Sequence, residues 1–170
     1  LKKDYNFTTE DDLKDKIDKI IHKRDQETIR QLTFLKKKHK DYCEVYRVEG
    51  VFYGHIGAKA EMKDAFYEVF RLAPDYPNPR AYFIERLRDV EAFDESLKEG
   101  IEGLKIFPEN IEIKLQLLKS KYYLRDFDQL TIKLANEIKD SATKQVNINY
   151  HFARKLANVA LEFHRRYAEF

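Results

Sequence analysis

A stretch of this chain recurs after 34 residues, and no other feature of the sequence limits its fold so strongly. Pro74 and Pro108 are 34 positions apart, and so are Phe93 and Phe127. A fixed period of this length is typical of helical repeat proteins, in which helix pairs stack and each pair covers the apolar face of the next. The sequence therefore predicts an all-α fold, a right-handed α-solenoid of stacked antiparallel helix pairs.

Hydrophobic spacing and turn residues divide the chain into successive units. Residues 1–7 are expected to form an N-terminal extension or linker, and residues 8–170 a single helical repeat domain. Helix pairs are predicted over 8–41, 43–76, 77–110 and 111–144, and a final helix over 145–170. The first pair depends on Thr8 or Thr9 as one helix cap and on Asp25 as the cap of a second helix.

Composition narrows the class of protein. Only 5 glycines and 4 prolines occur in 170 residues, too few turn residues for a β-sandwich of this length. The net charge of +2 gives no field that would indicate nucleic acid as a partner. No apolar run approaches the roughly 20 residues that span a bilayer, so no membrane role is expected. The single cysteine, Cys43, allows no internal disulfide, which favours a cytoplasmic location.

Several residues stand at the positions of a known repeat. The unit that begins at Cys43 has Tyr46, Gly50, Tyr53, Phe66 and Pro74 at its positions 4, 8, 11, 24 and 32. These residues resemble the tetratricopeptide repeat, or TPR, family. The resemblance covers residues 43–144 well and residues 8–42 only loosely. It implies that small side chains let paired helices approach, that aromatic residues fill the space between pairs, and that proline ends the second helix.

The resemblance also implies a concave groove lined by the first helix of each pair. Aromatic side chains, amides and both signs of charge fall at the groove positions, a mixture that suits an extended peptide or a protein helix. The candidate protein-binding residues are Arg47, His55, Asn78, Tyr82, Glu85, Arg88, Gln116, Lys119 and Tyr123. One TPR subclass grips the C-terminal carboxylate of chaperones, but of the five clamp positions here only Arg47 is basic, which disfavours that ligand.

No catalytic signature is found. Gly50, Gly54 and Gly57 lack the Lys-Ser/Thr ending of a phosphate-binding loop, and close helix packing explains them better. No two of the five histidines have the spacing of a zinc protease, and Cys43 has no identifiable base. We therefore expect no enzyme activity, no metal and no cofactor.

The sequence thus predicts a non-catalytic scaffold that binds a protein or peptide segment. The alternative is a self-association or sensor segment of a larger protein whose effector domain lies outside this chain. A homo-oligomer could form through the predicted C-terminal helix, whose apolar face carries Phe152, Leu156, Val159, Phe163 and Tyr167.

Overall fold

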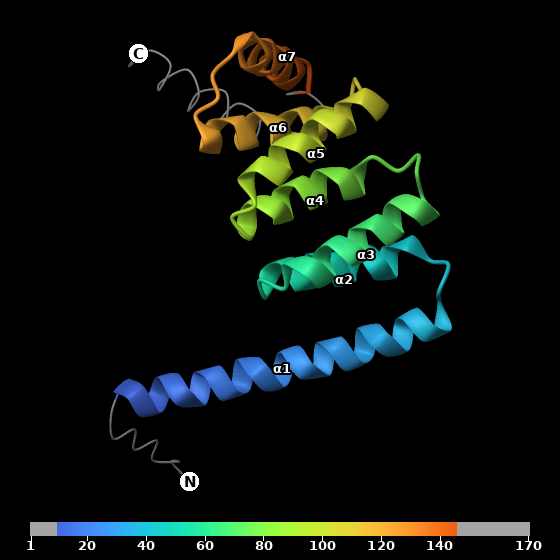
Figure 1. Cartoon of the computed structure of the whole chain (residues 1–170), viewed down its shortest axis with the longest axis vertical. Helices are drawn as coiled ribbons and strands as arrows, with labels where there is room; N and C mark the ends of the chain where they lie inside the picture. The colour runs from blue at the N-terminus through green and yellow to red at the C-terminus, as the bar shows by residue number, and fades with distance from the viewer. Residues whose placement is uncertain (1–9, 146–170) are drawn as a thin grey trace.

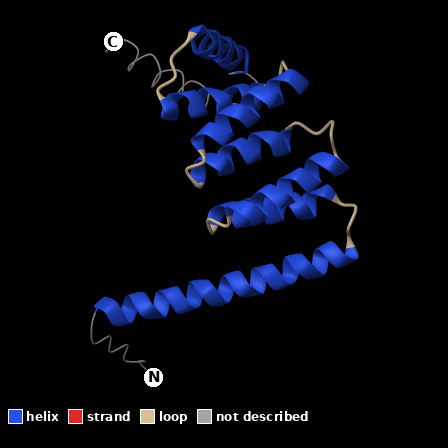
Figure 2. Ribbon diagram, viewed as in Figure 1, coloured by secondary structure: helices blue, strands red, loops and turns tan. Residues whose placement is uncertain are grey.

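The computed structural model describes residues 10–145, which form α-helices and contain no β-strand (Figure 1, Figure 2). The helices are α1 (Glu10–Lys38), α2 (Cys43–His55), α3 (Lys59–Leu72), α4 (Asn78–Asp89), α5 (Phe93–Ile106), α6 (Ile111–Leu124) and α7 (Gln129–Gln145). The pairs α2–α3, α4–α5 and α6–α7 coincide with the units predicted over 43–76, 77–110 and 111–144. The predicted extension over 1–7 and nearly all of the final helix over 145–170 lie outside the described residues.

The helical hairpin predicted over residues 8–41 is wrong. A single helix of 29 residues, α1, spans this part of the chain. Asp25 does not cap a second helix; its carboxylate accepts a hydrogen bond from the neighbouring Arg24. No glycine or proline occurs before Gly50, and Glu27 bonds to Arg30 and Gln31, three and four residues further on. Because nothing in this segment stops a helix and such pairs support one, the helix continues.

The turn inside each pair repeats in its backbone conformation as well as in its sequence. Gly57, Glu91 and Arg125 lie 34 residues apart, and all three have a positive φ, of 75°, 58° and 54°. The amide of the residue after each one donates to the carbonyl oxygen five positions back, at 2.8–2.9 Å in all three turns. This bond is the 6→1 bond of a Schellman motif, which ends a helix through one left-handed residue. Helices α3 and α5 begin two residues after the left-handed residue, at Lys59 and Phe93, whereas α7 begins four residues after it, at Gln129.

The turns between pairs also repeat where two of them can be compared. The amide of Ala73 donates to the carbonyl of Val69, and the amide of Phe107 donates to that of Gly103, 34 residues later. Asn110 then caps α6, because its side-chain oxygen accepts a hydrogen bond from the amide of Ile113 at 2.9 Å. Each pair is thus joined to the next by a short connection of similar shape.

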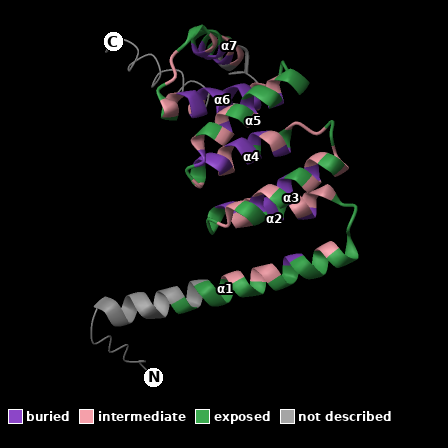
Figure 3. Ribbon diagram, in the orientation of Figure 1, coloured by how far each residue is buried: buried purple, intermediate pink, exposed green. Residues whose placement is uncertain are grey.

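The core lies along the line where successive helices meet (Figure 3). One cluster joins α3 to α4 and contains Met62, Phe66, Phe83 and Leu87. A second cluster joins α6 to α7 and contains Leu115, Leu117, Leu118, Leu134, Ala135 and Ile138. The side chains of Phe66, Phe83, Leu87, Leu117, Leu118 and Leu134 are all buried.

The described helices succeed one another along one direction (Figure 1). Each packs against helices one or two places away in the chain, as α2 does with α3 and α4, and α4 does with α5 and α6. Helix α1 packs only against α2 within the described residues. The first helices α2, α4 and α6 are therefore brought side by side, which positions the candidate site.

Candidate functional site

A depression lies between the first helices of two successive pairs. It has a volume of about 180 Å³ and is lined by Asn78, Ala81, Tyr82 and Glu85 of α4 and by Glu112 and Gln116 of α6. Asn78 and Tyr82 are exposed, whereas Glu85 and Glu112 are half-buried. Ala81 and Gln116 are buried. The structure therefore brings an aromatic ring, two carboxylates and two amides around one hollow.

Four of the nine predicted binding residues line this depression: Asn78, Tyr82, Glu85 and Gln116. They come from α4 and α6, the first helices of consecutive units, and Tyr82 and Gln116 occupy the same position of the 34-residue repeat. The remaining five lie on the same helices or on α2, in different settings.

Arg47 reaches the depression's edge from α2. Its guanidinium carbon lies 5.1 Å from the centre of the Tyr82 ring, a cation–π distance. Its Nε donates to Glu44 Oε2 at 2.7 Å, one turn earlier on the same helix. The cation–π contact links α2 to α4 beside the hollow, and the bond to Glu44 orients Arg47 on its own helix.

Arg88 lies in the core, with only 8 % of its surface exposed. Its Nη1 donates to the carbonyl of Gln116 at 2.9 Å and to the hydroxyl of Ser120 at 3.2 Å, and its Nη2 donates to Gln116 Oε1. Burial lowers the pKa of the Arg88 guanidinium, while the nearby Glu85 and Asp89 oppose that shift. Its placement argues against Arg88 as a contact to a partner.

The buried network around Arg88 continues to a third helix. The Ser120 and Ser96 hydroxyls lie 2.5 Å apart, and Ser96 Oγ donates to the carbonyl of Ile84 at 3.0 Å. Helices α4, α5 and α6 are thereby joined through hydrogen bonds inside the protein. Buried polar groups of this kind must all be paired, so the network holds Gln116 in place under the depression.

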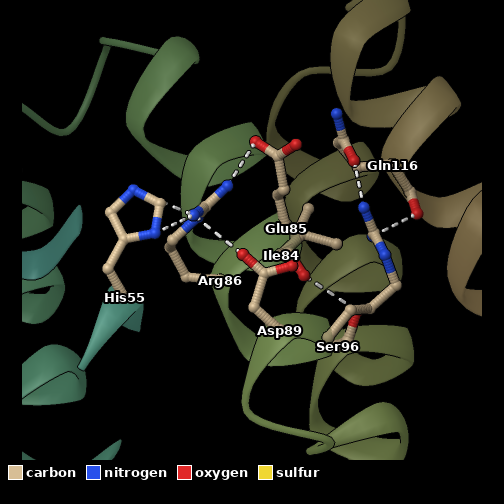
Figure 4. Close-up of polar contacts among 8 residues, drawn as sticks. His55, Ile84, Glu85, Arg86, Asp89, Ser96 and Gln116 are labelled. Carbon is tan, nitrogen blue, oxygen red and sulfur yellow. Dashed lines mark hydrogen bonds and ion pairs between the residues drawn. The ribbon is translucent and has the colours of Figure 1, made fainter. Parts of the chain in front are cut away.

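His55 belongs to a second polar cluster, centred on Arg86. Arg86 Nη1 lies 3.2 Å from His55 Nδ1 and 2.8 Å from Asp89 Oδ2, and Arg86 Nη2 lies 3.2 Å from Glu85 Oε2 (Figure 4). Glu85 and Asp89 therefore share one cation. His55 is exposed at the end of α2 and remains within reach of a partner.

Lys119 and Tyr123 lie further along α6. Lys119 is half-buried, and Tyr123 is 60 % exposed. The Tyr123 ring stacks on Phe93 with the ring centres 5.4 Å apart and the planes 15° apart. Neither residue lines the depression, but Tyr123 extends the exposed aromatic surface of the same row of helices.

The nine predicted residues omitted two that line the hollow, Ala81 and Glu112. Both fall at groove positions of the repeat, so the periodicity was the signal that could have found them. Glu44 and Arg86 pair with charges beside the hollow; Glu44 also falls at a groove position of the repeat, whereas Arg86 does not. Only the contacts in the structure reveal their part.

Two other findings concern the whole described part of the chain. Among the side chains that the structure describes, no group of three or more His, Cys, Asp or Glu residues is arranged to hold a metal ion. Among the described helices, none combines the length and the apolar character needed to cross a bilayer.

No protein-family model matches this chain, and no curated protein matches it either. The all-helical architecture with its 34-residue backbone repeat is what the structure itself defines.

Proposed function

We propose that this chain is a TPR-like α-solenoid that binds an extended segment of another protein along α2, α4 and α6. This role is non-catalytic. The observation that carries the proposal is the depression between α4 and α6, whose lining residues all come from the first helices of two consecutive units. A row of such helices offers the same kind of surface from unit to unit.

The exposed aromatic side chains support this proposal. Tyr82 is 41 % exposed beside the depression and Tyr123 is 60 % exposed on the neighbouring first helix. Rigid aromatic side chains at accessible positions are common anchors of protein interfaces because they bury much area at little entropic cost. Val48 on α2 adds an exposed apolar side chain to the row.

Selection of peptides from a random display library against the whole chain tests the proposal. Selected peptides are then synthesised, and their dissociation constants are measured by fluorescence anisotropy with wild type and Tyr82→Ala. We expect Tyr82→Ala to weaken binding by about tenfold or more, the loss typical of a central aromatic anchor.

Ile132→Ala is the matched control, since Ile132 is an exposed apolar residue on α7, outside the row of first helices. It should leave the dissociation constants unchanged. Circular dichroism checks that both variants remain helical. Peptides that bind wild type and Tyr82→Ala equally well would contradict the proposed groove, as would failure to select any peptide.

A second candidate function is self-association through α1. Phe34 is 64 % exposed, and together with Leu35, Glu27, Arg30 and Gln31 it lines an open hollow on this helix. In sequence, residues 10–18 carry five acids and two lysines, whereas residues 30–38 carry four basic residues and no acid. Two antiparallel copies of α1 would place opposite charges beside each other, which favours a second copy of this chain as the occupant.

Light scattering over a wide concentration range tests self-association. If α1 pairs with a second copy, wild type forms dimers and Phe34→Asp/Leu35→Asp is a monomer at the same concentration. Ile132→Asp, an exposed change away from α1, should leave the dimer intact. A wild-type protein that stays monomeric throughout would exclude this candidate.

A further inference from the structure

We propose that the depression between α4 and α6 receives a lysine or arginine side chain of the bound segment. This inference rests on the proposed function and adds the chemical class of its partner. It follows from the charges around the depression, from the exposed ring beside it and from its size.

The charged residues that line the depression are both acidic. Glu112 forms no ion pair with any of the described residues. Glu85 has Arg86 as its ion-pair partner, at 3.2 Å, and shares that cation with Asp89, which is closer at 2.8 Å. A cation that enters the hollow would therefore meet two carboxylates, and an anion would meet repulsion from both.

The positively charged side chains nearby do not cancel the negative charge of the depression. The charge of Arg47 is neutralised by Glu44, whose Oε2 lies 2.7 Å from Arg47 Nε, and the charge of Arg86 is neutralised by Asp89. Arg88 is buried and bonded to Gln116 and Ser120, so it adds one positive charge beneath the depression. With two carboxylates against one guanidinium, the net charge is −2 + 1 = −1.

The Tyr82 ring adds a second attraction for a cation. Arg47 already lies over this ring at 5.1 Å, which shows that the ring accepts a guanidinium within the protein. Tyr82 is still 41 % exposed, so part of the side chain remains accessible beside the carboxylates. A lysine or arginine side chain there would gain cation–π and charge–charge attraction together.

The size of the depression favours one side chain over a whole small molecule. Its volume of about 180 Å³ is below the roughly 300 Å³ at which small-molecule pockets usually begin. A long side chain of an extended peptide can fill such a hollow while the peptide backbone continues along the helices.

A double-mutant cycle on the selected peptides tests the inference. In each peptide that depends on Tyr82, every arginine is replaced by citrulline, its neutral isostere, and every lysine by glutamine. Binding is measured by anisotropy with wild type and with Glu85→Gln/Glu112→Gln. We expect that neutralising one particular basic residue of the peptide weakens its binding to wild type by about tenfold. This is the combined effect of losing two exposed charge pairs and one cation–π contact.

The same neutralisation should have little effect on binding to Glu85→Gln/Glu112→Gln, because this variant lacks the two carboxylates that would attract the basic residue. Glu61→Gln/Asp64→Gln, which removes two exposed acids on α3, is the matched control and should behave as wild type. Two outcomes would overturn the inference and leave the proposed function standing. In the first, the peptides need Tyr82 but no basic residue; in the second, neutralising a basic residue has the same effect with wild type and with Glu85→Gln/Glu112→Gln. If no peptide depends on Tyr82, the proposed function fails and the inference fails with it.

Discussion

Two residues take a backbone conformation that glycine would adopt more easily. Gly57, Glu91 and Arg125 occupy the same turn position with positive φ, but only the first is glycine. A side chain in the left-handed region costs roughly 1–2 kcal/mol because Cβ crowds the backbone. Glu91 and Arg125 keep this conformation because the Schellman bond and the packing of the next helix determine it.

Replacing Glu91 by glycine should relieve this strain. We expect Glu91→Gly to raise the free energy of unfolding by up to about 1 kcal/mol, since the relief exceeds the entropy that glycine adds to the unfolded chain. Urea denaturation measures the change. Gly57→Ala is the reverse control: nothing lies within 4 Å of the added Cβ, so the loss of about 1 kcal/mol expected there comes from φ alone. A destabilised Glu91→Gly would contradict this account.

At Gly50 the requirement is space. A Cβ added there would lie 2.7 Å from two ring carbons of Phe66, which is fully buried. We expect Gly50→Ala to lower the free energy of unfolding by about 1–3 kcal/mol, because the ring has no room to move.

Gly103→Ala is the control for Gly50→Ala. Its added Cβ would lie 3.2 Å from Ile113 Cγ2, a smaller overlap, and the better helix propensity of alanine, about 1 kcal/mol, offsets it. Urea denaturation should place Gly103→Ala within about 1 kcal/mol of wild type. Equal losses in both variants would show that steric overlap with Phe66 is not the cause.

At the scale of elements, ion pairs connect the second helices of successive pairs. Lys63 Nζ donates to Glu95 Oε2 at 2.7 Å, and Lys59 pairs with the other oxygen of the same carboxylate. These contacts join α3 of one pair to α5 of the next. They lower the pKa of Glu95 below its ordinary value of 4.5.

This shift makes stability depend on pH. Because the pKa of Glu95 is lower in the folded state, the unfolded state binds more protons between the two pKa values, so stability rises with pH there. The contribution is complete above about pH 4.5 and is lost as pH falls through the lowered value. Urea unfolding at pH 7 and at pH 3 should therefore differ less for Glu95→Gln than for wild type.

Glu61→Gln is the control for Glu95→Gln, since Glu61 is exposed and forms no ion pair with the described residues. It should keep the pH dependence of wild type. If Glu95→Gln and Glu61→Gln show the same pH dependence, the two lysines do not hold the carboxylate as described.

Sequence patterns predicted the helices of three units chiefly through the 34-residue period. Gly57 and Pro74 mark helix ends in the first of these units, whereas residues 111–144 contain no glycine or proline and are placed by their spacing from the units before them.

Before Gly50 the sequence patterns gave a wrong prediction of two helices. No glycine or proline ends a helix there, and Asp25, which the pattern offers as a helix cap, bonds to Arg24 instead. The sequence patterns also could not separate Arg88 from its exposed neighbours. Arg88 occupies a groove position by its spacing, yet it lies in the core, where it donates hydrogen bonds to acceptors on α6. Such long-range pairing leaves no local signal in the sequence.

At the scale of the whole molecule, the described helices are unequally supported. Helix α6 packs against α4, α5 and α7, whereas α1 packs against α2 alone. Leu32 is the one buried residue among the described side chains of α1. Most of the described side chains of α1 are therefore exposed, and a helix without apolar cover is only marginally stable in water.

Hydrogen exchange followed by mass spectrometry should show this difference directly. We expect the amides of residues 22–34 in α1 to exchange faster than those of α6 at micromolar protein concentration, because local opening costs less where few apolar contacts are lost. Amides of α4 serve as the internal control and should be protected like those of α6. Equal protection of α1 and α6 in dilute protein would contradict this expectation.

The hydrogen-bonded chain from Arg88 through Gln116 and Ser120 to Ser96 has a consequence for engineering this array. Its members come from two adjacent units, and each unit supplies what the other lacks. Exchanging the order of these units, or inserting a copy of the first unit between them, would leave the Arg88 guanidinium in the interior without these acceptors. The units thus share a period but are not modular parts, and any redesign must transplant the four residues together.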